Sequence, residues 1–275
     1  MNPFVHTCIS PHGFEIIPNL DVANHAGILR LRQALEKQGA QMEEAKPDAL
    51  VVLTPHGLRI ADHFSIGVSE WMRGSAEYEG KQVMMEQKVH RSLARGIARH
   101  AAERRLPVAA VNFATAEGPL SSLPLDWGSM VPLWFMPDVP IVVITPSRDV
   151  PVDMHIQFGH ALAEVVSQSE LRVGLIVSCD WAHTHEATGP YGYSETAKHL
   201  DKEVREIVQT GDWERLAQFD RDFVEAAKPD GISQMLIASG AILREDRSLD
   251  AFTYECPTYF GMLVAGLARP KTPVL

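Results

Sequence analysis

Short, almost continuous runs of apolar residues alternate with longer amphipathic stretches along this chain, and this alternation limits the folds that it can adopt. The clearest runs are Ala49–Thr54, Val139–Thr145 and Arg172–Ser178. Such runs are typical of strands buried on both faces, which occur mainly in parallel sheets covered by helices. We therefore expect an α/β protein with three layers, α/β/α, and a mostly parallel central sheet.

The rest of the chain continues the same alternation. Further extended segments are expected at Phe4–Ser10, at Val108–Phe113 and in a last piece that leads to Tyr254. Helices are expected at Gly27–Ala45, at Lys88–Arg105, at Asp153–Gln168 and over most of the chain from Glu195 to Ser239. The segment Leu120–Pro137, rich in Pro, Gly and Trp, is expected to be an ordered loop. Because no linker-like segment separates these elements, residues 1–275 are expected to form a single domain.

The composition argues against several classes of protein. The 275 residues carry a formal net charge of −10, which disfavours binding to the phosphate backbone of nucleic acids. The three cysteines, Cys8, Cys179 and Cys256, are odd in number and far apart, which favours a reducing compartment over a disulfide framework. Neither a signal peptide nor an apolar run of the ~20 residues needed to cross a bilayer is visible. We therefore expect a cytoplasmic protein that binds neither nucleic acid nor membranes.

Two nearly identical tetrapeptides follow two of the predicted strands. The first is Ser-Pro-His-Gly around His12, and the second is Thr-Pro-His-Gly around His56. Proline fixes the backbone at the strand exit and glycine allows an immediate turn, so each histidine is held rigidly. A strand–helix–strand unit joins the motifs, so the two strands can be neighbours, with both imidazoles at the carboxyl ends where α/β sheets bind ligands. Although one such motif is commonly a plain surface turn, the pair favours a site for Fe(II), Zn(II) or Mn(II).

Polar side chains also follow two other predicted strands. The sequence Cys-Asp-Trp-Ala-His-Thr-His, residues 179–185, comes directly after Arg172–Ser178. His183 could bind the metal or carry protons beside it, because imidazole titrates near pH ~6.5; otherwise the segment is a cap with two solvated histidines. Arg148 follows Val139–Thr145 and could bind a substrate carboxylate or form an ordinary surface pair with Asp149.

The order of these motifs resembles that of the class III extradiol ring-cleavage dioxygenases, the superfamily of the protocatechuate 4,5-dioxygenase catalytic subunit and the Memo-like proteins. The resemblance also rests on two further segments, Asp-Trp-Gly-Ser-Met-Val-Pro-Leu at 126–133 and Gly-Pro-Tyr-Gly-Tyr at 189–193. It runs from about residue 8 to 262. The resemblance implies a non-haem Fe(II) held by His12, His56 and a carboxylate, with three positions left for substrate and O2. It also implies that His183 is the base that handles the hydroxyl proton of the substrate.

The resemblance leaves the carboxylate ligand open. In the family it lies early in the helix before a Gly-Ala-Leu-like motif, here residues 240–242. This position indicates Asp230, although the better-known enzymes carry glutamate there and Memo-like proteins can carry cysteine. Glu255 is the second choice and Glu225 the third. Asp230 could instead cap a helix, which is a common role for aspartate.

Trp127 is a second departure from the family pattern. Family members usually have Asp-His-Gly where this chain has Asp-Trp-Gly at 126–128, and that histidine lies near the substrate and assists with proton transfer or O2. Tryptophan cannot carry a proton, because its indole N–H only donates a hydrogen bond. Trp127 could stack on an aromatic substrate, or it could be a packed loop residue.

Three functions follow from these residues. The resemblance implies oxidative ring cleavage of a catechol-type or aminophenol-type aromatic substrate with O2. The departure at Trp127 supports the alternative, a Memo-like metal-binding or partner-binding protein without ring cleavage. A Zn(II)-dependent hydrolase that uses the same two histidines is the third. We expect a homo-oligomer, and the resemblance leaves open whether a small accessory subunit is needed, as in some family members.

Overall fold

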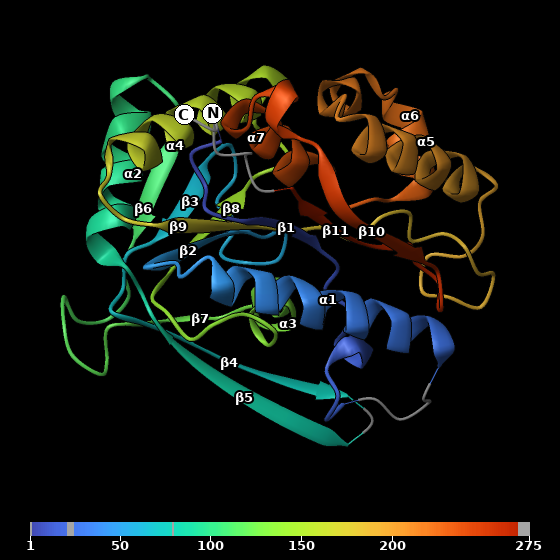
Figure 1. Ribbon diagram of the computed structural model, residues 1–275, viewed down its shortest axis with the longest axis horizontal. Coiled ribbons are helices and arrows are strands. Elements are labelled where there is room, and N and C mark those ends of the chain that lie inside the picture. The colour runs from blue at the N-terminus through green and yellow to red at the C-terminus, as the bar shows by residue number, and fades with distance from the viewer. Residues whose placement is uncertain (1, 21–24, 79, 269–275) are drawn as a thin grey trace, which may run out of the picture.

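The computed structural model describes residues 2–20, 25–78 and 80–268, and in it a large sheet lies between two layers of other elements (Figure 1). The sheet has eight strands in the order β10-β11-β1-β9-β2-β8-β3-β6. Its central strands are β1 (Thr7–Ser10), β9 (Val173–Ser178), β2 (Ala49–Leu53) and β8 (Ile141–Pro146). Its outer strands are β10 (Leu249–Glu255), β11 (Met262–Leu267), β3 (Phe64–Gly67) and β6 (Val108–Val111). The predicted three-layer α/β/α fold is therefore confirmed.

The centre of the sheet is parallel, as the apolar runs predicted. Strand β9 pairs in parallel with β1 on one side and with β2 on the other, and β2 pairs in parallel with β8. Antiparallel pairing is confined to the flanks, where β11 joins β1 and β10, and β3 joins β8. Every residue of β1, β2, β8 and β9 is buried, because helices or a second sheet cover both faces.

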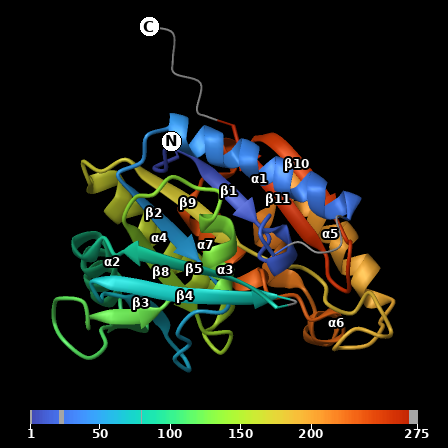
Figure 2. The ribbon, with the colours of Figure 1, turned by 90° about the horizontal axis from the view of Figure 1, so that it is seen from below.

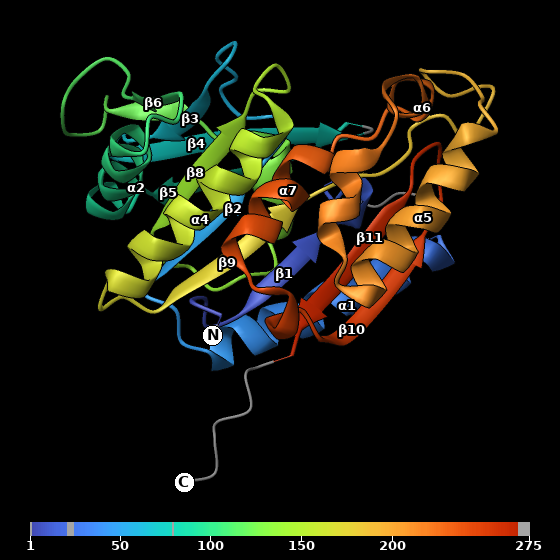
Figure 3. The ribbon, with the colours of Figure 1, turned by 90° about the horizontal axis from the view of Figure 1, so that it is seen from above.

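Different elements cover the two faces of the sheet. On one face lie α2 (Arg91–Glu103), α4 (Val152–Gln168), α5 (Thr196–Thr210), α6 (Arg221–Ala227) and α7 (Ile232–Ala241), as Figure 3 shows. On the other lie α1 (Ala26–Glu44), α3 (Trp127–Leu133) and a sheet of β4 (Trp71–Tyr78), β5 (Lys81–Lys88) and β7 (Ser122–Pro124), visible in Figure 2. Within the described ranges, no helix has the length and apolar character needed to cross a membrane.

Two local predictions were wrong. Strands β1 and β2 are not neighbours, because β9 lies between them. Part of Leu120–Pro137 is β7 and α3 instead of loop, since the carboxylate of Asp126 caps α3 by accepting a hydrogen bond from the N–H of Ser129 at 3.0 Å. The motif glycines Gly13 and Gly57 turn without a positive φ, and a Cβ at Gly57 would overlap Oγ1 of Thr145, so glycine is needed there for close approach. Only four described glycines have a positive φ, namely Gly80, Gly118, Gly192 and Gly211.

Other elements were not foreseen. They are the short strand β3, the β4–β5 hairpin and strand β11. The predicted helices α1, α2 and α4 begin and end within about three residues of their predicted limits. Residue 1 and residues 269–275, which belong to the predicted domain 1–275, lie outside the described residues.

Candidate metal centre

The three sequence motifs lie close together because the strands that they follow, β1, β9 and β2, are adjacent in the sheet. Ser10 at the end of β1 is aligned with Ser178 at the end of β9, and Leu53 of β2 is aligned with Val177. Three adjacent parallel strands therefore end at the same level of the sheet. The segments that follow them carry His12, His56 and Asp180 into one region, as ligand-binding sites of α/β sheets commonly require.

Ser178 fixes the tautomer of His12. The Ser178 hydroxyl donates a hydrogen bond to the carbonyl oxygen of Gly128 at 2.5 Å, so its oxygen accepts one from the Nδ1–H of His12 at 3.0 Å. His12 is buried, and with the proton on Nδ1 its Nε2 lone pair points at His56 and Asp230. A hydrogen bond at the outer nitrogen is the usual way in which a metal-binding histidine is oriented.

Asp230 does not cap a helix. The residue at the start of α7 is Gly231, and no side chain caps this helix end. The carboxylate of Asp230 instead accepts a hydrogen bond from the N–H of Asp180 at 2.9 Å through Oδ1, and it directs Oδ2 at both histidines. A Cβ at Gly231 would lie 2.6 Å from the Cβ of Cys179, so a glycine is needed for α7 to begin this close to β9.

The three candidate ligand atoms form a nearly equilateral triangle. His12 Nε2 lies 3.1 Å from His56 Nε2 and 3.1 Å from Asp230 Oδ2, and His56 Nε2 lies 3.2 Å from the same oxygen. Adjacent ligands of an octahedral ion are about 1.4 bond lengths apart, which is about 3.0 Å for bonds of about 2.1 Å. A tetrahedral ion would hold them about 3.4 Å apart. The sides of the triangle lie between these two values, so one divalent ion could contact all three atoms, as in the two-histidine, one-carboxylate iron sites.

The pKa values reflect the buried charge of this cluster. Burial lowers the pKa of His12, but Asp180 and Asp230 outweigh burial and raise it to about 9. Burial raises the pKa of Asp180 to about 8, against the opposing effect of His12. Burial alone would also raise the pKa of Asp230, but His12 and His56 hold it well below its usual range. A divalent cation would replace the proton on His12, because a nitrogen must be deprotonated to bind metal.

Replacing Ser178 with alanine is expected to weaken divalent-metal binding about 10–100-fold, the usual effect of losing the outer partner of a histidine ligand. Without the hydroxyl, the Nδ1–H of His12 loses its acceptor and the ring is free to change tautomer. Calorimetric titration with Fe(II) under nitrogen measures the change. Ser239→Ala is the matched control, because this buried hydroxyl bonds only within its own helix, to the carbonyl of Leu236. Equal affinity in the two variants would contradict this role of Ser178.

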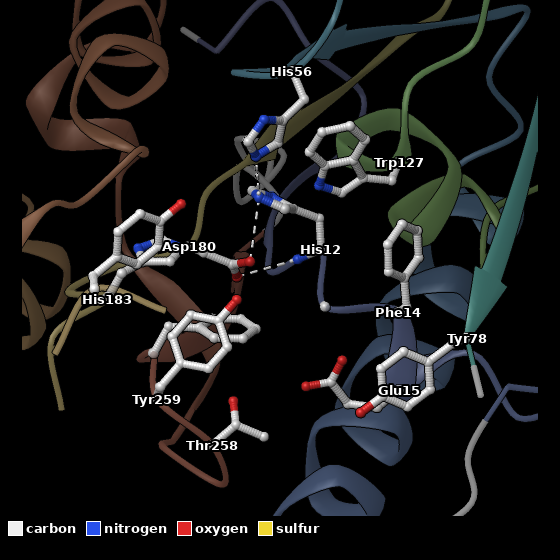
Figure 4. A pocket seen from close by; sticks show the side chains of 13 residues that line it. His12, Phe14, Glu15, His56, Tyr78, Trp127, Asp180, His183, Thr258 and Tyr259 are labelled. Atoms are coloured by element: carbon white, nitrogen blue, oxygen red, sulfur yellow. Dashed lines mark hydrogen bonds and ion pairs between the residues drawn. The ribbon is translucent and has the colours of Figure 1, made fainter. Parts of the chain in front are cut away.

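A cavity of about 390 Å³ opens from the cluster. Figure 4 shows His56 and Trp127 side by side at one end of the cavity, with Phe14, Tyr78 and Glu15 further along. His183, Tyr191, Thr258, Tyr259 and Phe260 line the remaining wall. Aromatic walls around a few polar groups are typical of a site that binds a flat organic ligand.

His183 lies in this wall and is suited to accept a proton. Its ring stacks on Phe260 with centroids 5.2 Å apart, and its Nδ1 is buried without a hydrogen-bond partner within the described chain. Burial lowers the pKa of His183, so its imidazole is neutral near pH 7.

The indole of Trp127 covers one face of the His56 imidazole. Its ring stacks on His56 with centroids 4.2 Å apart and an interplanar angle of 25°, and it lies 6.1 Å from Phe14. It is the first residue of α3, 42% of its surface is exposed, and it lines the cavity. The indole therefore offers an apolar face to a ligand and cannot accept or transfer a proton.

The other two candidate carboxylates lie outside the cluster. Glu255, at the end of β10, forms a bidentate ion pair with Arg30 of α1, with distances of 2.5 and 3.0 Å. Glu225 is exposed and pairs with Lys228 at 2.6 Å. Among the residues that the structure describes, the group of potential metal ligands is His12, His56 and Asp230. The structure thus favours Asp230 among the three candidate carboxylates.

Asp180 was not predicted as a site residue, although it belongs to the third motif. Its Oδ2 lies 3.2 Å from His12 Nε2, and its Oδ1 accepts a hydrogen bond from the backbone N–H of His12 at 3.2 Å. The aromatic wall residues Phe14, Tyr259 and Phe260 were also missed. Their common signal, an aromatic residue just after a strand or in a loop beside a motif, is too frequent to single them out.

Comparison with known proteins agrees with the geometry of the site. A two-histidine, one-carboxylate cluster at the carboxyl edge of a parallel sheet defines the class of candidate mononuclear non-haem metal centres. Residues 7–264 match the family described as the catalytic LigB subunit of aromatic ring-opening dioxygenase. The chain belongs to this family.

Individual relatives are distant. Protein CA_C1420 of Clostridium acetobutylicum is 24% identical over 250 residues, which cover 89% of this chain and 53% of that protein. The chain thus spans about half the length of this relative. The crystal structure of uncharacterized protein JW3007 from Escherichia coli K12 is similar with a TM-score of 0.61 and 16% identity, over 96% of this chain and 99% of that one. This likeness shows a shared fold.

Proposed function

We propose that this protein is an Fe(II)-dependent extradiol dioxygenase that opens a catechol-type or aminophenol-type ring with O2. The observation that carries the proposal is the triangle of His12, His56 and Asp230, whose 3.1–3.2 Å sides allow one divalent ion to contact two imidazoles and one carboxylate. Two neutral imidazoles and one carboxylate also suit Fe(II) chemically, with Zn(II) or Mn(II) as other possible occupants. Family membership supports the same reaction class.

A bound Fe(II) would supply neighbouring coordination positions for a chelating diol and for O2, together with the electrons that activate them. The chain supplies the remaining functions. Phe14, Trp127 and Tyr259 line the cavity and would hold the substrate ring against its walls. His183, neutral and with one ring nitrogen unpaired among the described residues, would accept the hydroxyl proton of the substrate as it chelates.

The proposal is tested by oxygen uptake. The protein is loaded with Fe(II) under nitrogen and mixed with air-saturated solutions of catechol, 2-aminophenol, 3,4-dihydroxybenzoate or gallate. We expect O2 consumption in step with a new visible absorbance from the ring-opened product, and no such signal from metal-free protein. Absence of turnover with the whole panel, at full iron occupancy, would contradict the proposal.

His183→Gln is expected to lower kcat about 10²–10⁴-fold, the usual contribution of a general base, while the iron content stays unchanged. Glutamine keeps polarity and approximate size but cannot take up a proton at neutral pH. His199→Gln is a matched control, because this histidine is exposed on α5 and does not line the cavity at the cluster. A His183→Gln enzyme with normal kcat would remove His183 from the reaction.

One observation favours a second candidate, a metal-binding protein without ring cleavage. Trp127 stacks directly on His56 and is a residue that cannot transfer protons. If the protein binds one Fe(II) per chain and consumes no O2, this second candidate is supported. Restored uptake in Trp127→His would then identify the indole as the cause.

A further inference from the structure

A second cavity opens from the same cluster in another direction. It has a volume of about 290 Å³ and shares His56, His183 and Tyr191 with the aromatic-walled cavity. Its other walls come from the carboxyl end of β8 and from the segment between α6 and α7, with Arg148, Val224, Glu225, Lys228, Pro229 and Asp230. A ligand seated at the cluster could therefore extend into either cavity.

The two cavities differ in charge. Among the described residues, neither lysine nor arginine lines the aromatic-walled cavity, which carries the acidic side chains Glu15 and Asp180. The second cavity contains both Arg148 and Lys228. These two cations lie beside the carboxylates of Glu225 and Asp230, so the second cavity has charged groups of both signs, whereas the lysine- and arginine-free cavity has acidic ones alone.

Arg148 is the cation of this cavity that is available to a ligand. The ammonium of Lys228 is held by Glu225 at 2.6 Å. Arg148 is exposed, and no hydrogen bond or ion pair with a residue in the described ranges holds its guanidinium. Its charge acts only weakly on Glu225, where it is the smallest of the named influences that lower the pKa of that carboxyl. A guanidinium offers a planar pair of N–H donors that matches a carboxylate.

We propose that Arg148 is a specificity-determining residue that binds an anionic substituent, a carboxylate, of the aromatic substrate within the second cavity. The proposal rests on the proposed function in that the ring chelates at the His12–His56–Asp230 cluster. The substrate would then lie in one defined orientation. The ring contacts the wall formed by Trp127 and His56, and its charged substituent points toward the end of β8, away from Glu15.

The test compares ligands that differ only in charge. The probes are 3,4-dihydroxybenzoate and 3-(3,4-dihydroxyphenyl)propionate, each paired with its neutral primary amide. They are titrated under nitrogen into protein loaded with Zn(II), which does not react with O2, and binding is followed by tryptophan fluorescence and calorimetry. We expect at least one acid to bind about tenfold more tightly than its amide, the usual effect of one charge-assisted hydrogen-bond pair.

Variants assign this preference to one residue. In Arg148→Gln the acid and its amide should bind equally, and in Arg148→Lys the preference should fall but not vanish. Arg221→Gln is the matched control, because it removes the same charge from exposed α6 without touching either cavity. It should retain the tenfold preference.

Three results would overturn the proposal. These are equal binding of acids and amides by the wild type, an unchanged preference in Arg148→Gln, or no binding of any probe. The measurement is independent of turnover, so it separates this proposal from the proposed function. A charge preference without O2 uptake would retain Arg148 as an anion site and reject ring cleavage. O2 uptake without a charge preference would do the reverse.

Discussion

Replacing His56 with alanine is expected to lower the affinity for Fe(II) more than about 100-fold, beyond the effect of removing an outer hydrogen-bond partner. Only two of the three ligand atoms of the triangle would then remain, His12 Nε2 and Asp230 Oδ2. The fold should survive, because the His56 side chain is 22% exposed, lines the cavity and is not part of the hydrophobic core. The measurements are metal content after dialysis and calorimetric titration with Fe(II).

Thermal unfolding gives a second readout of the same change. A ligand present at 100 times its Kd stabilises the native state by about 2.7 kcal/mol, so Fe(II) should raise the Tm of the wild type. His56→Ala should show almost no rise. The control is His160→Ala, an exposed histidine of α4 that is not part of the cluster, which should keep both the metal and the rise in Tm. A His56→Ala protein that still binds one Fe(II) with wild-type affinity would exclude His56 as a ligand.

Gly240→Ala is expected to lower the free energy of unfolding by about 3 kcal/mol, at the upper end of the usual range for overpacking. Helices α4 and α7 touch through their backbones, and a Cβ at Gly240 would overlap the carbonyl oxygen of Ile156. Rotation of a side chain cannot relieve this overlap, because the atom that it meets belongs to the backbone. Urea denaturation followed by circular dichroism measures the loss.

The matched control is Gly96→Ala in α2. There an added Cβ would meet only a side-chain carbon of Val165, at an ordinary distance of 3.9 Å. Alanine is favoured over glycine in a helix by about 0.5–1 kcal/mol, so this variant should be as stable as the wild type or slightly more stable. Because α7 begins two residues after Asp230, Gly240→Ala should also weaken metal binding. If Gly240→Ala were as stable as Gly96→Ala, the backbone contact of α7 with α4 at Gly240 would be contradicted.

The central sheet could be predicted from the sequence because its strands are buried on both faces. The runs at 49–54, 139–145 and 172–178 contain almost no polar residue, and little else gives that pattern. The hairpin strand Lys81–Lys88 could not be recognised in the same way. Most of its residues are exposed or half-buried, and its glutamine, glutamate, lysine and methionine residues favour helices more than strands.

The candidate site was predictable where a motif repeats and less so where only the fold brings residues together. The two Pro-His-Gly segments identified His12 and His56 because each lies at a strand end. Asp230 lies 218 positions from His12, and the sequence could not separate it from Glu255 on geometric grounds. The ion pair of Glu255 with Arg30 and the alignment of Ser178 with Ser10 depend on strand order, which the sequence left open.

The most direct test of this account is the position of the metal. Crystals grown under nitrogen with Fe(II) would be measured at wavelengths on both sides of the iron absorption edge, so that the anomalous signal locates iron alone. We expect one ion per chain within about 2.0–2.3 Å of His12 Nε2, His56 Nε2 and Asp230 Oδ2, with the remaining positions facing the two cavities. Iron bound elsewhere, or an iron-free cluster in protein that carries iron in solution, would contradict the account.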